Sequence, residues 1–326
     1  MKAIVLFGGS GFVGTHLSRM LYDQKLFDKI YLADIKKPKQ KNPGCEYIKC
    51  DVRKPIDAAV FADKPLFIVN LAAIHTSPGY PANEYFEANI LGAKNICAFA
   101  ELLDINKTLF TSSISVYGPG EDEKTEESVQ MPAIPYGSSK AIAEYIHREW
   151  FIKSETERML CMVRPGVIFG MGEGGNFTRI ANALEKGFFP LPGRRDTIKA
   201  CLYVKDLCRF IISKLDAPAG FSFFNFCLPQ KITIQEIVDT FKNDIGYKAW
   251  TPLIPLWIID FAAVVLGALN IPFIRNKGIV PERIVKLVKS TNISSQKLIH
   301  SGFDFKYNLA DALKDWSNDC GGKTLY

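Results

Sequence analysis

A loop of regularly spaced glycines near the N-terminus constrains what this chain can fold into. Gly8 ends an apolar run at residues 2–8, and Gly11 and Gly14 follow it at the start of a helical pattern at residues 12–24. Between a strand and a helix, such glycines allow a tight turn, close approach of the backbone to a pyrophosphate and close packing of the helix on the strand. The helix N-terminus adds unpaired N–H groups and a positive dipole. The loop therefore predicts a site for the phosphates of a dinucleotide.

The apolar runs that follow this loop predict a doubly wound α/β fold, a Rossmann-like parallel sheet with helices on both faces. Short runs rich in β-branched and aromatic residues alternate with helix-length segments and occupy residues 2–8, 29–35, 46–51, 65–73, 107–113 and 158–170. The longest helical pattern, at 82–104, has one face that we expect to be buried, formed by Tyr85, Ala88, Asn89, Gly92, Ile96 and Phe99.

The second half of the chain has a different pattern. After about residue 170, glycine and proline punctuate shorter segments, which predicts a smaller substrate-binding lobe. The segment 201–215 again has the pattern of a strand end followed by an amphipathic helix, so we expect it to return to the first domain. The expected division is a nucleotide-binding domain at 1–170 plus about 200–228, and a substrate-binding lobe at 171–199 and 229–326.

Carboxylates at the ends of the second and third apolar runs indicate which dinucleotide binds. Asp34 comes twenty residues after Gly14, where a carboxylate accepts hydrogen bonds from the adenosine ribose of NAD and repels the 2′-phosphate of NADP. Lys36 and Lys37 lie close enough to weaken that preference, or else belong to a solvated turn. Asp51, which precedes Val52, follows the third run, where a carboxylate can meet the adenine.

A tyrosine and a lysine four residues apart suggest the chemistry. Tyr136 and Lys140 follow Pro135, a helix-start signal, and helical spacing would place the ammonium beside the phenol. A neighbouring ammonium and a cationic nicotinamide both favour the phenolate, which could then exchange a proton with a substrate hydroxyl during hydride transfer. Ser112 and Ser113 end the strand pattern at 107–113, where ligands bind in this fold, and one of the two hydroxyls could orient the substrate oxygen.

Together these features resemble those of the extended short-chain dehydrogenases/reductases, in particular the NAD-dependent sugar epimerase/dehydratase family. The resemblance covers residues 4–210 and the C-terminal stretch 293–316. Its motifs are GGSGFVG, Asp34, DVR, NLAA, NILGAKN, SSISVYG, YGSSK, RPGVIFG and CLYVKDL. REWFIKSETER, RPGVIFG and the pair Gly175-Asn176 are most similar to bacterial 4-epimerases that act on N-acetylhexosamines carried by a nucleotide or a polyprenyl diphosphate.

This resemblance assigns expected roles to individual residues. It implies that Tyr136 is the catalytic base, Lys140 its partner, and Ser113, four residues before Tyr117, the hydroxyl that orients the substrate. The residues expected to contact NAD are Gly8, Gly11, Phe12, Val13, Gly14, Asp34, Asp51, Val52, Leu71, Ala72, Ala73, Asn89, Tyr136 and Lys140. The residues expected to contact a diphosphate-linked sugar are His75, Ser113, Asn176, Lys199 and Arg283. A homodimer through the helices that carry Tyr136 and Asn89 is also implied.

Three functions remain open at this point. Family dehydratases carry an Asp-Glu pair after the hydroxyl residue, whereas this chain has Ile114 and Ser115, so dehydration is not expected. The leading prediction is an NAD-dependent 4-epimerase that passes through a transient 4-keto sugar. The same residues would also suit a reductase of a 4-keto sugar that exchanges NAD(P)H in every cycle. A cofactor-sensing protein without turnover is the third alternative, although retention of Ser113, Tyr136 and Lys140 favours an enzyme.

An apolar segment followed by a basic one stands out in the C-terminal half. Residues 252–274 contain a single charge, Asp260, and Pro255 and Pro272 bracket too few residues for a transmembrane helix. Residues 275–297 carry six basic residues and one acidic residue, a net charge of +5 in a chain whose total is +6. The segment 252–297 could form a peripheral contact with an anionic membrane, or pack in the core beside a basic face that holds a diphosphate.

Composition excludes several other classes of protein. Eight cysteines without a C-x-x-C pair indicate reduced thiols and a cytoplasmic protein, either free or peripheral at the inner membrane surface. Four histidines offer little for a transition-metal site, and none is expected. Glu144 and His147 form a single E-x-x-H, which we attribute to a solvated helix face. The aromatic residues are not interleaved with basic ones, so nucleic-acid binding is not expected.

Overall fold

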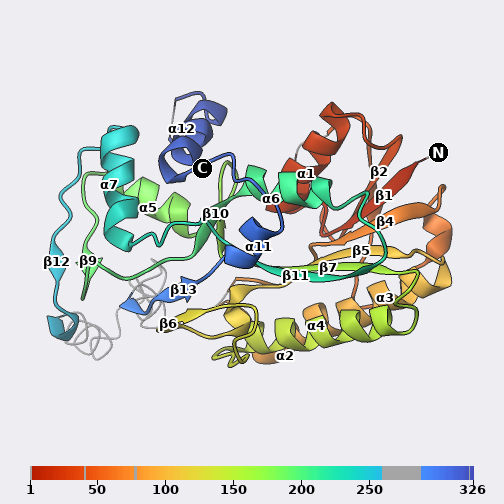
Figure 1. Ribbon diagram of the computed structural model, residues 1–326. Helices are drawn as coiled ribbons and strands as arrows, with labels where there is room; N and C mark the ends of the chain where they lie inside the picture. The colour runs from red at the N-terminus through yellow and green to blue at the C-terminus, as the bar shows by residue number, and fades with distance from the viewer. Residues whose placement is uncertain (1, 40–41, 77–78, 259–287, 323) are drawn as a thin grey trace.

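The computed structural model describes residues 2–39, 42–76, 79–258, 288–322 and 324–326. Its centre is a seven-stranded parallel sheet with the strand order β11-β7-β5-β4-β1-β2-β3 (Figure 1). The strands are β1 (Ala3–Phe7), β2 (Lys29–Asp34), β3 (Cys45–Lys49), β4 (Pro65–Asn70), β5 (Lys107–Thr111), β7 (Met159–Pro165) and β11 (Gly220–Phe226). The order reverses direction between β1 and β4, and ligands bind at such a point in doubly wound folds. The predicted fold class is confirmed.

Helices cover both faces of the sheet (Figure 1). Helix α1 (Phe12–Asp23) packs beside α6 (Val204–Ser213) on one face. The other face carries α2 (Ala82–Phe86), the π-helical turn η2 (Glu87–Leu91), α3 (Gly92–Leu102) and α4 (Pro135–Ile152). The helix predicted at 82–104 is therefore confirmed with the expected buried face, and the π turn inside it is the feature that the spacing did not predict.

The run at 158–170 forms two strands rather than one. The run forms hydrogen bonds within the main sheet only as far as Pro165. The residues that follow form β8 (Val167–Phe169), which pairs with β10 (Cys201–Tyr203). A Cβ on Gly166 would lie 2.6 Å from the carbonyl oxygen of Ala200, so only glycine allows this crossing. The break turns the chain out of the sheet at its carboxyl edge, toward the smaller lobe.

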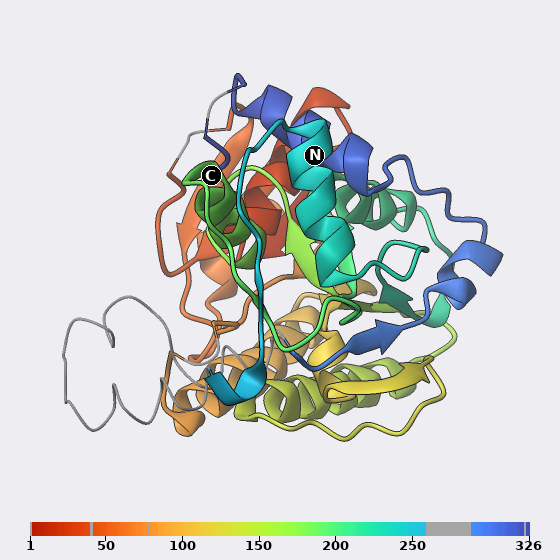
Figure 2. The same cartoon turned by 90° about the vertical axis from the view of Figure 1, so that its left-hand side faces the viewer.

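The remaining elements are η1 (Ala58–Val60), η3 (Ile114–Val116), β6 (Gly120–Lys124), α5 (Asn176–Glu185), β9 (Leu191–Pro192), α7 (Ile234–Asp244), β12 (Leu253–Ile254), β13 (Thr291–Ile293), α11 (Gln296–His300) and α12 (Leu309–Asp319). Of these, η1 lies in the connection between β3 and β4, and the others follow β5 in the chain. β9 pairs with β12, and β6 pairs with β13, both in parallel. Figure 2, which looks onto the lobe, shows α7 in front and the chain that leads into β12 running down its outer side.

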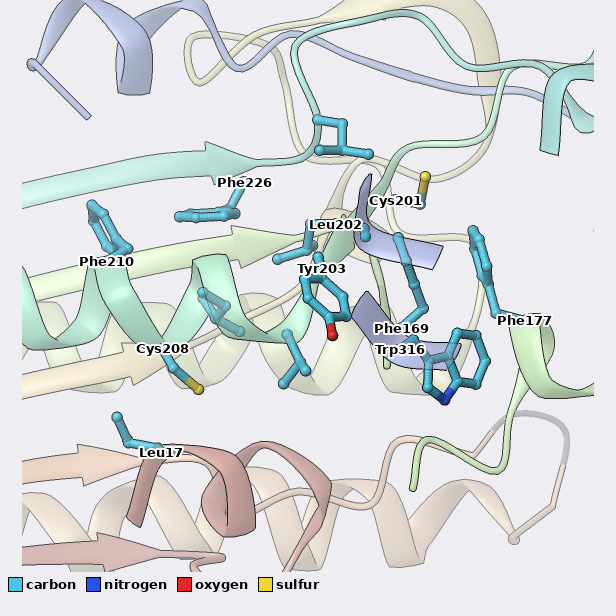
Figure 3. Close-up of a cluster of buried hydrophobic side chains, with 14 of the residues drawn as sticks. Leu17, Phe169, Phe177, Cys201, Leu202, Tyr203, Cys208, Phe210, Phe226 and Trp316 are labelled. Carbon is cyan, nitrogen blue, oxygen red and sulfur yellow. The ribbon is translucent and has the colours of Figure 1, made fainter. Parts of the chain in front are cut away.

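One hydrophobic cluster joins the sheet domain to these elements. It contains Leu17 of α1, Cys208 and Phe210 of α6, Phe177 of α5 and Trp316 of α12 (Figure 3). Phe169 stacks on Phe177, with ring centroids 4.2 Å apart. Because the cluster is continuous, α5 and α12 are fixed relative to the sheet by shared buried apolar area.

Part of the predicted apolar and basic segment, including Arg283, lies at residues 259–287, outside the described residues. Among the helices of the described ranges, none combines the length and the apolar character needed to cross a bilayer.

Candidate active site

The glycine loop has the geometry that a dinucleotide phosphate site requires. Gly8 has φ +77°, and a Cβ there would lie 2.8 Å from the backbone nitrogen of Ala72. A Cβ on Gly14 would lie 2.5 Å from the carbonyl oxygen of Gly9, so glycine is needed for α1 to approach the loop. Gly11 caps α1 without a side-chain hydrogen bond, and Phe12 and Val13 begin the helix. The first backbone N–H groups of α1 are therefore available to an anion.

Two further observations show that this loop fits the phosphates and ribose of NAD. Ser10 Oγ is buried and has no hydrogen-bond partner among the described residues. Asp34, at the end of β2, accepts hydrogen bonds from the backbone N–H groups of Ser10 and Lys36, each at 3.1 Å. Asp34 thereby ties the glycine loop to the second strand, where a ribose hydroxyl is bound in this fold.

The residues that follow β4 form the opposite wall. Leu71 donates its N–H to the carbonyl oxygen of Phe7 at 2.8 Å, and Ala72 donates to Asn70 Oδ1 at 3.1 Å. Asn89 is buried, and its amide holds the backbone N–H of Ile74 at 3.0 Å and Ser139 Oγ at 2.8 Å. Asn89 therefore connects the loop that follows Ala73 to α4.

Asp51 and Val52 lie at the far end of the same edge. Arg53 donates to Asp51 through Nε at 2.9 Å and Nη2 at 2.8 Å, and this hydrogen bonding lowers the pKa of the Asp51 carboxyl. The Val52 carbonyl accepts from Asn95 Nδ2 at 2.8 Å. Asp51 is thus paired with Arg53 in this structure.

Ser113 and Tyr136 meet where β5 ends and α4 begins. Ser113 is buried and caps η3 by accepting the N–H of Ser115 at 3.1 Å. Tyr136 is half-buried in the first turn of α4, which Pro135 opens. Burial raises the pKa of the Tyr136 phenol, and a hydrogen bond from Ser113 opposes that shift. The hydroxyl of Ser112, the residue before Ser113, is buried without a partner among the described residues.

Lys140 is anchored on strand β5. Its ammonium Nζ donates to the carbonyl oxygen of Thr111 at 2.7 Å and lies 4.7 Å from the centroid of the Phe110 ring. The four-residue spacing predicts that Nζ lies beside the Tyr136 phenol, and this stays a prediction; the hydrogen bond of Nζ to the Thr111 carbonyl ties the side chain to β5. Burial lowers the pKa of Lys140 to about 7, and the charge of Glu144 opposes this effect.

The sequence analysis missed a polar network beneath Lys140. Glu144 and His147 are 4% and 0% exposed, so the prediction of a solvated helix face was wrong. Arg164 donates to Glu144 from Nε at 2.9 Å and from Nη2 at 2.6 Å, and its Nη1 donates to Tyr117 Oη at 2.5 Å. Spacings of four and seven residues from Lys140 are the signal that these side chains share its buried face.

His147 connects this network to the wall after β4. Its Nδ1 lies 2.8 Å from the Ala143 carbonyl oxygen, and its Nε2 lies 3.2 Å from Asn70 Nδ2. A neutral ring with the proton on Nδ1 satisfies both contacts. Burial lowers the pKa of His147 to about 4, which keeps the ring neutral. Asn70 in turn accepts the N–H of Ala72, so His147 supports the predicted cofactor wall.

The predicted substrate residues occupy the lobe side of the same edge. His75 lies in the exposed loop after β4, and Asn176 is exposed at the first position of α5. Glu173 accepts the N–H and the hydroxyl of Thr178 at 3.0 and 2.7 Å and so occupies that helix N-terminus. Lys199 Nζ donates to the Lys289 carbonyl oxygen at 2.8 Å, and burial lowers the pKa of Lys199 to about 8.

Comparison with known proteins identifies the family of this chain. Residues 4–223 match the model of the family described as "NAD dependent epimerase/dehydratase family". The N-acetyl-alpha-D-glucosaminyl-diphospho-ditrans,octacis-undecaprenol 4-epimerase of Escherichia coli O157:H7 is 28% identical over 95% of this chain and 92% of its own length. The UDP-glucose 4-epimerase of Vibrio cholerae is 25% identical over 83% of this chain and 84% of its own length.

Solved structures match the fold along the whole chain. The UDP-N-acetylglucosamine 4-epimerase from Bacillus cereus superposes with a TM-score of 0.77 at 19% identity, over 99% of this chain and 98% of that one. The matched residues 4–223 include the glycine loop, Asp34, Ser113, Tyr136 and Lys140. The chain belongs to the NAD-dependent epimerase/dehydratase family, and its cofactor is NAD.

Proposed function

We propose that this protein is an NAD-dependent 4-epimerase of a diphosphate-linked N-acetylhexosamine. The observation that carries the proposal is the placement of Ser113, at the end of β5, and Tyr136, in the first turn of α4, together with a glycine loop whose buried Ser10 hydroxyl has no partner among the described residues. The similarity over 95% of the chain to an epimerase named for a lipid diphosphate sugar supports the substrate class.

The proposed division of labour follows the two parts of the chain. Residues 1–170 with about 200–228 hold NAD, which supplies a hydride acceptor and donor when bound. Residues 171–199 and 229–326 hold the sugar and its diphosphate. His75, Asn176 and Lys199 are the proposed contacts among the described residues, and Arg283 is a further one outside them.

Side chains of the protein then transfer a single proton. Ser113 orients the sugar hydroxyl toward Tyr136, whose phenolate takes the hydroxyl proton as carbon 4 is oxidised and returns it after the sugar has turned. In the structure, burial raises the pKa of the Tyr136 phenol, so positive charge is needed to form the phenolate. Lys140 supplies part of that charge from its position on the Thr111 carbonyl.

A 4-epimerase and a 4-keto sugar reductase would use these same groups, so the test must separate them. The purified protein is incubated with catalytic NAD and no reductant, with UDP-N-acetylglucosamine and the polyprenyl diphosphate counterpart in parallel. A galacto epimer from either carrier supports the epimerase. Absence of any epimer, with stoichiometric oxidation of NAD(P)H on a 4-keto sugar, would favour the reductase.

We also propose a homodimer through the helices on the Tyr136 side of the sheet. The outer surfaces of η2, α3 and α4 expose large apolar side chains, namely Leu91, Leu102, Ile142, Tyr145 and Ile152. Tyr145 is 64% exposed and lies on the same helix as Tyr136, with its side chain at the surface. A twofold axis beside α4 would cover these side chains with their own copies.

The proposed location is the cytoplasmic side of a membrane, with peripheral contact through part of residues 252–297. A diphosphate sugar that is attached to a polyprenyl chain stays at the bilayer surface, so the enzyme must reach it there.

A further inference from the structure

The outer edge of the lobe carries a pair of chain segments with unusual surface chemistry. Residues 186–195 and 245–258 run in parallel and are joined by β9 and β12; we refer to them as the outer ribbon. The backbone N–H of Trp250 donates to the Gly187 carbonyl oxygen at 2.9 Å, and the backbone N–H of Gly193 donates to the Ile254 carbonyl oxygen at 2.8 Å. In Figure 2 the second segment, in cyan, runs down the outside of the lobe.

One side of the outer ribbon is buried and the other is exposed and apolar. Phe189 and Leu191 are 9% and 0% exposed and belong to the hydrophobic cluster that joins the lobe to the sheet. The exposed apolar side chains are Phe188, Trp250, Leu253, Leu256, Trp257 and Ile258, of which both tryptophans are 70% exposed. Phe188 and Trp250 lie together at the surface, with ring centroids 5.6 Å apart.

The backbone of the ribbon is arranged so that these side chains remain outside. Gly193 has φ +69°, and a Cβ there would lie 2.8 Å from Leu256 Cγ. Leu256 therefore covers the glycine and stays on the outer face together with Trp257. An exposed apolar cluster of this kind marks an interaction surface rather than an ordinary solvated one.

The charges of the outer ribbon indicate which kind of surface it binds. Its two segments contain four basic residues, Lys186, Arg194, Arg195 and Lys248, and no Asp or Glu. Arg194 pairs with Asp196, just beyond the first segment, and with Glu121 of β6, so the positive charge of the ribbon rests on Lys186 and Lys248, which are exposed, and on Arg195. Tryptophan is favoured where an apolar medium meets water, because the ring is apolar and its N–H can stay hydrated. Apolar rings flanked by cations match the acyl chains and phosphates of an anionic bilayer.

We infer that the outer ribbon docks the protein on an anionic lipid bilayer, with Trp250 and Trp257 inserted at the interface. The inference rests on the proposed function in assigning a purpose to the contact, since a polyprenyl-linked sugar is presented at that surface. The contact itself needs no turnover, so the two proposals can fail separately.

The four tryptophans of the chain provide a direct test. Trp150 and Trp316 are 2% and 0% exposed, whereas Trp250 and Trp257 are exposed, so a quencher within the bilayer should reach only the second pair. The full-length protein is mixed with phosphatidylcholine vesicles that contain phosphatidylglycerol, with and without lipid brominated on its acyl chains. We expect the wild type to sediment with the vesicles and to be quenched by the brominated lipid.

Two variants make the result specific. Trp250→Phe/Trp257→Phe keeps the apolar rings but leaves only the buried tryptophans, so it should bind vesicles and lose the quenching. Trp257→Glu should weaken vesicle binding by about tenfold or more, because a charge replaces a ring that is inserted in the bilayer. Leu66→Glu is the matched control: Leu66 is 50% exposed and lies at the start of β4, outside both the outer ribbon and the helices of the proposed dimer.

Three results would overturn the inference. The first is a wild-type protein that stays in the supernatant with anionic vesicles. The second is equal binding by Trp257→Glu and the wild type. The third is a lipid-free protein whose exposed tryptophans are already shielded from an aqueous quencher in a manner that depends on protein concentration, which would assign the ribbon to a second copy of the chain. Vesicle binding by a protein that epimerises neither sugar carrier would leave this inference standing and remove the proposed function.

Discussion

Glu144 and Arg164 form a bidentate ion pair inside the protein, with side chains only 5% and 7% exposed. Glu144 belongs to α4, which carries Tyr136 and Lys140, and Arg164 belongs to β7 of the main sheet. Gln130 donates to the same carboxylate at 2.8 Å, and Tyr117 Oη accepts from the guanidinium. The pair therefore fixes the catalytic helix against the strand that supports it.

Breaking this pair from one side should cost much more than breaking a surface pair. Glu144→Gln leaves a buried guanidinium without its counter-charge, so the free energy of unfolding should fall by about 3–5 kcal/mol. Asp23→Asn is the matched control, because Asp23 and its partner Arg19 are 61% and 70% exposed, and a loss below about 1 kcal/mol is expected there. Denaturant unfolding measures both. Equal losses would contradict the assignment of a buried pair.

His147 should make the stability depend on pH. Its pKa falls from 6.5 in a solvated chain to about 4 in the fold, so the unfolded state binds the extra proton between these values. Stability is then fully present above pH 6.5 and is lost as the pH falls toward 4, by up to about 3 kcal/mol. We expect His147→Leu to flatten this slope, measured by denaturant unfolding across that range. His300→Gln changes an exposed imidazole and should retain the slope; a wild-type slope in His147→Leu would refute the role.

Substitution of the loop glycines should affect NAD affinity at one position and stability at another. A Cβ on Gly11 meets only the Gly8 carbonyl, at 3.2 Å, so Gly11→Ala should fold and lose NAD affinity by about tenfold or more, or ~1.4 kcal/mol. A Cβ on Gly14 meets the Gly9 backbone at 2.5 Å, so Gly14→Ala should lower the free energy of unfolding by about 1–3 kcal/mol. Calorimetric NAD titration and denaturant unfolding distinguish them. Unchanged NAD affinity in Gly11→Ala would contradict the assignment of the loop to the cofactor site.

Tyr136 should be needed for turnover and not for binding. Tyr136→Phe removes the proton carrier and keeps the ring, so the rate should fall by about 10²–10⁴-fold while NAD remains bound. Tyr145→Phe, a change on the exposed surface of the same helix, is the control. Epimer formation and bound NAD are measured on the same preparations. Retained turnover in Tyr136→Phe would exclude this tyrosine as the base, and a protein without turnover in any form would favour the sensor alternative.

The proposed dimer can be tested by placing charge on its surface. Tyr145→Lys puts an ammonium where two copies of α4 would meet, so sedimentation equilibrium should show a shift from dimer to monomer. Val129→Lys is the control, because Val129 is 77% exposed and lies outside these helices. A wild-type protein that sediments as a monomer, or a Tyr145→Lys variant that remains a dimer, would contradict the interface.

The sequence predicted those parts of the protein that local spacing determines. The glycine loop, Asp34 at the end of β2 and the helix start at Pro135 are each set by a few adjacent residues, and the structure places them as expected. The parallel sheet followed from alternation of strand and helix patterns. The order of its strands did not, because the pairing of β7 with β5 and β11 joins residues that are far apart in the chain.

The buried polar contacts were beyond prediction for a related reason. Lys140 was predicted from helical spacing alone, but its acceptor is the Thr111 carbonyl on another element. Glu144 and His147 were assigned to solvent because charged and polar residues are usually exposed. Their partners, Arg164 and Asn70, come from two different strands, and only the assembled fold brings them into reach.

The pairing of β13 with β6 sets an order on biosynthesis. Thr291 pairs with Gly120, and Ser290 donates to Glu121 from its hydroxyl at 2.8 Å, so the segment that follows the Ser113–Tyr117 turn is held by residues near the end of the chain. During translation the ribosome releases all seven strands of the main sheet, complete at Phe226, well before this closing strand emerges. A nascent chain can therefore assemble its nucleotide cradle while the substrate side is still unfinished, and catalytic competence arrives only after Thr291–Ile293 has emerged.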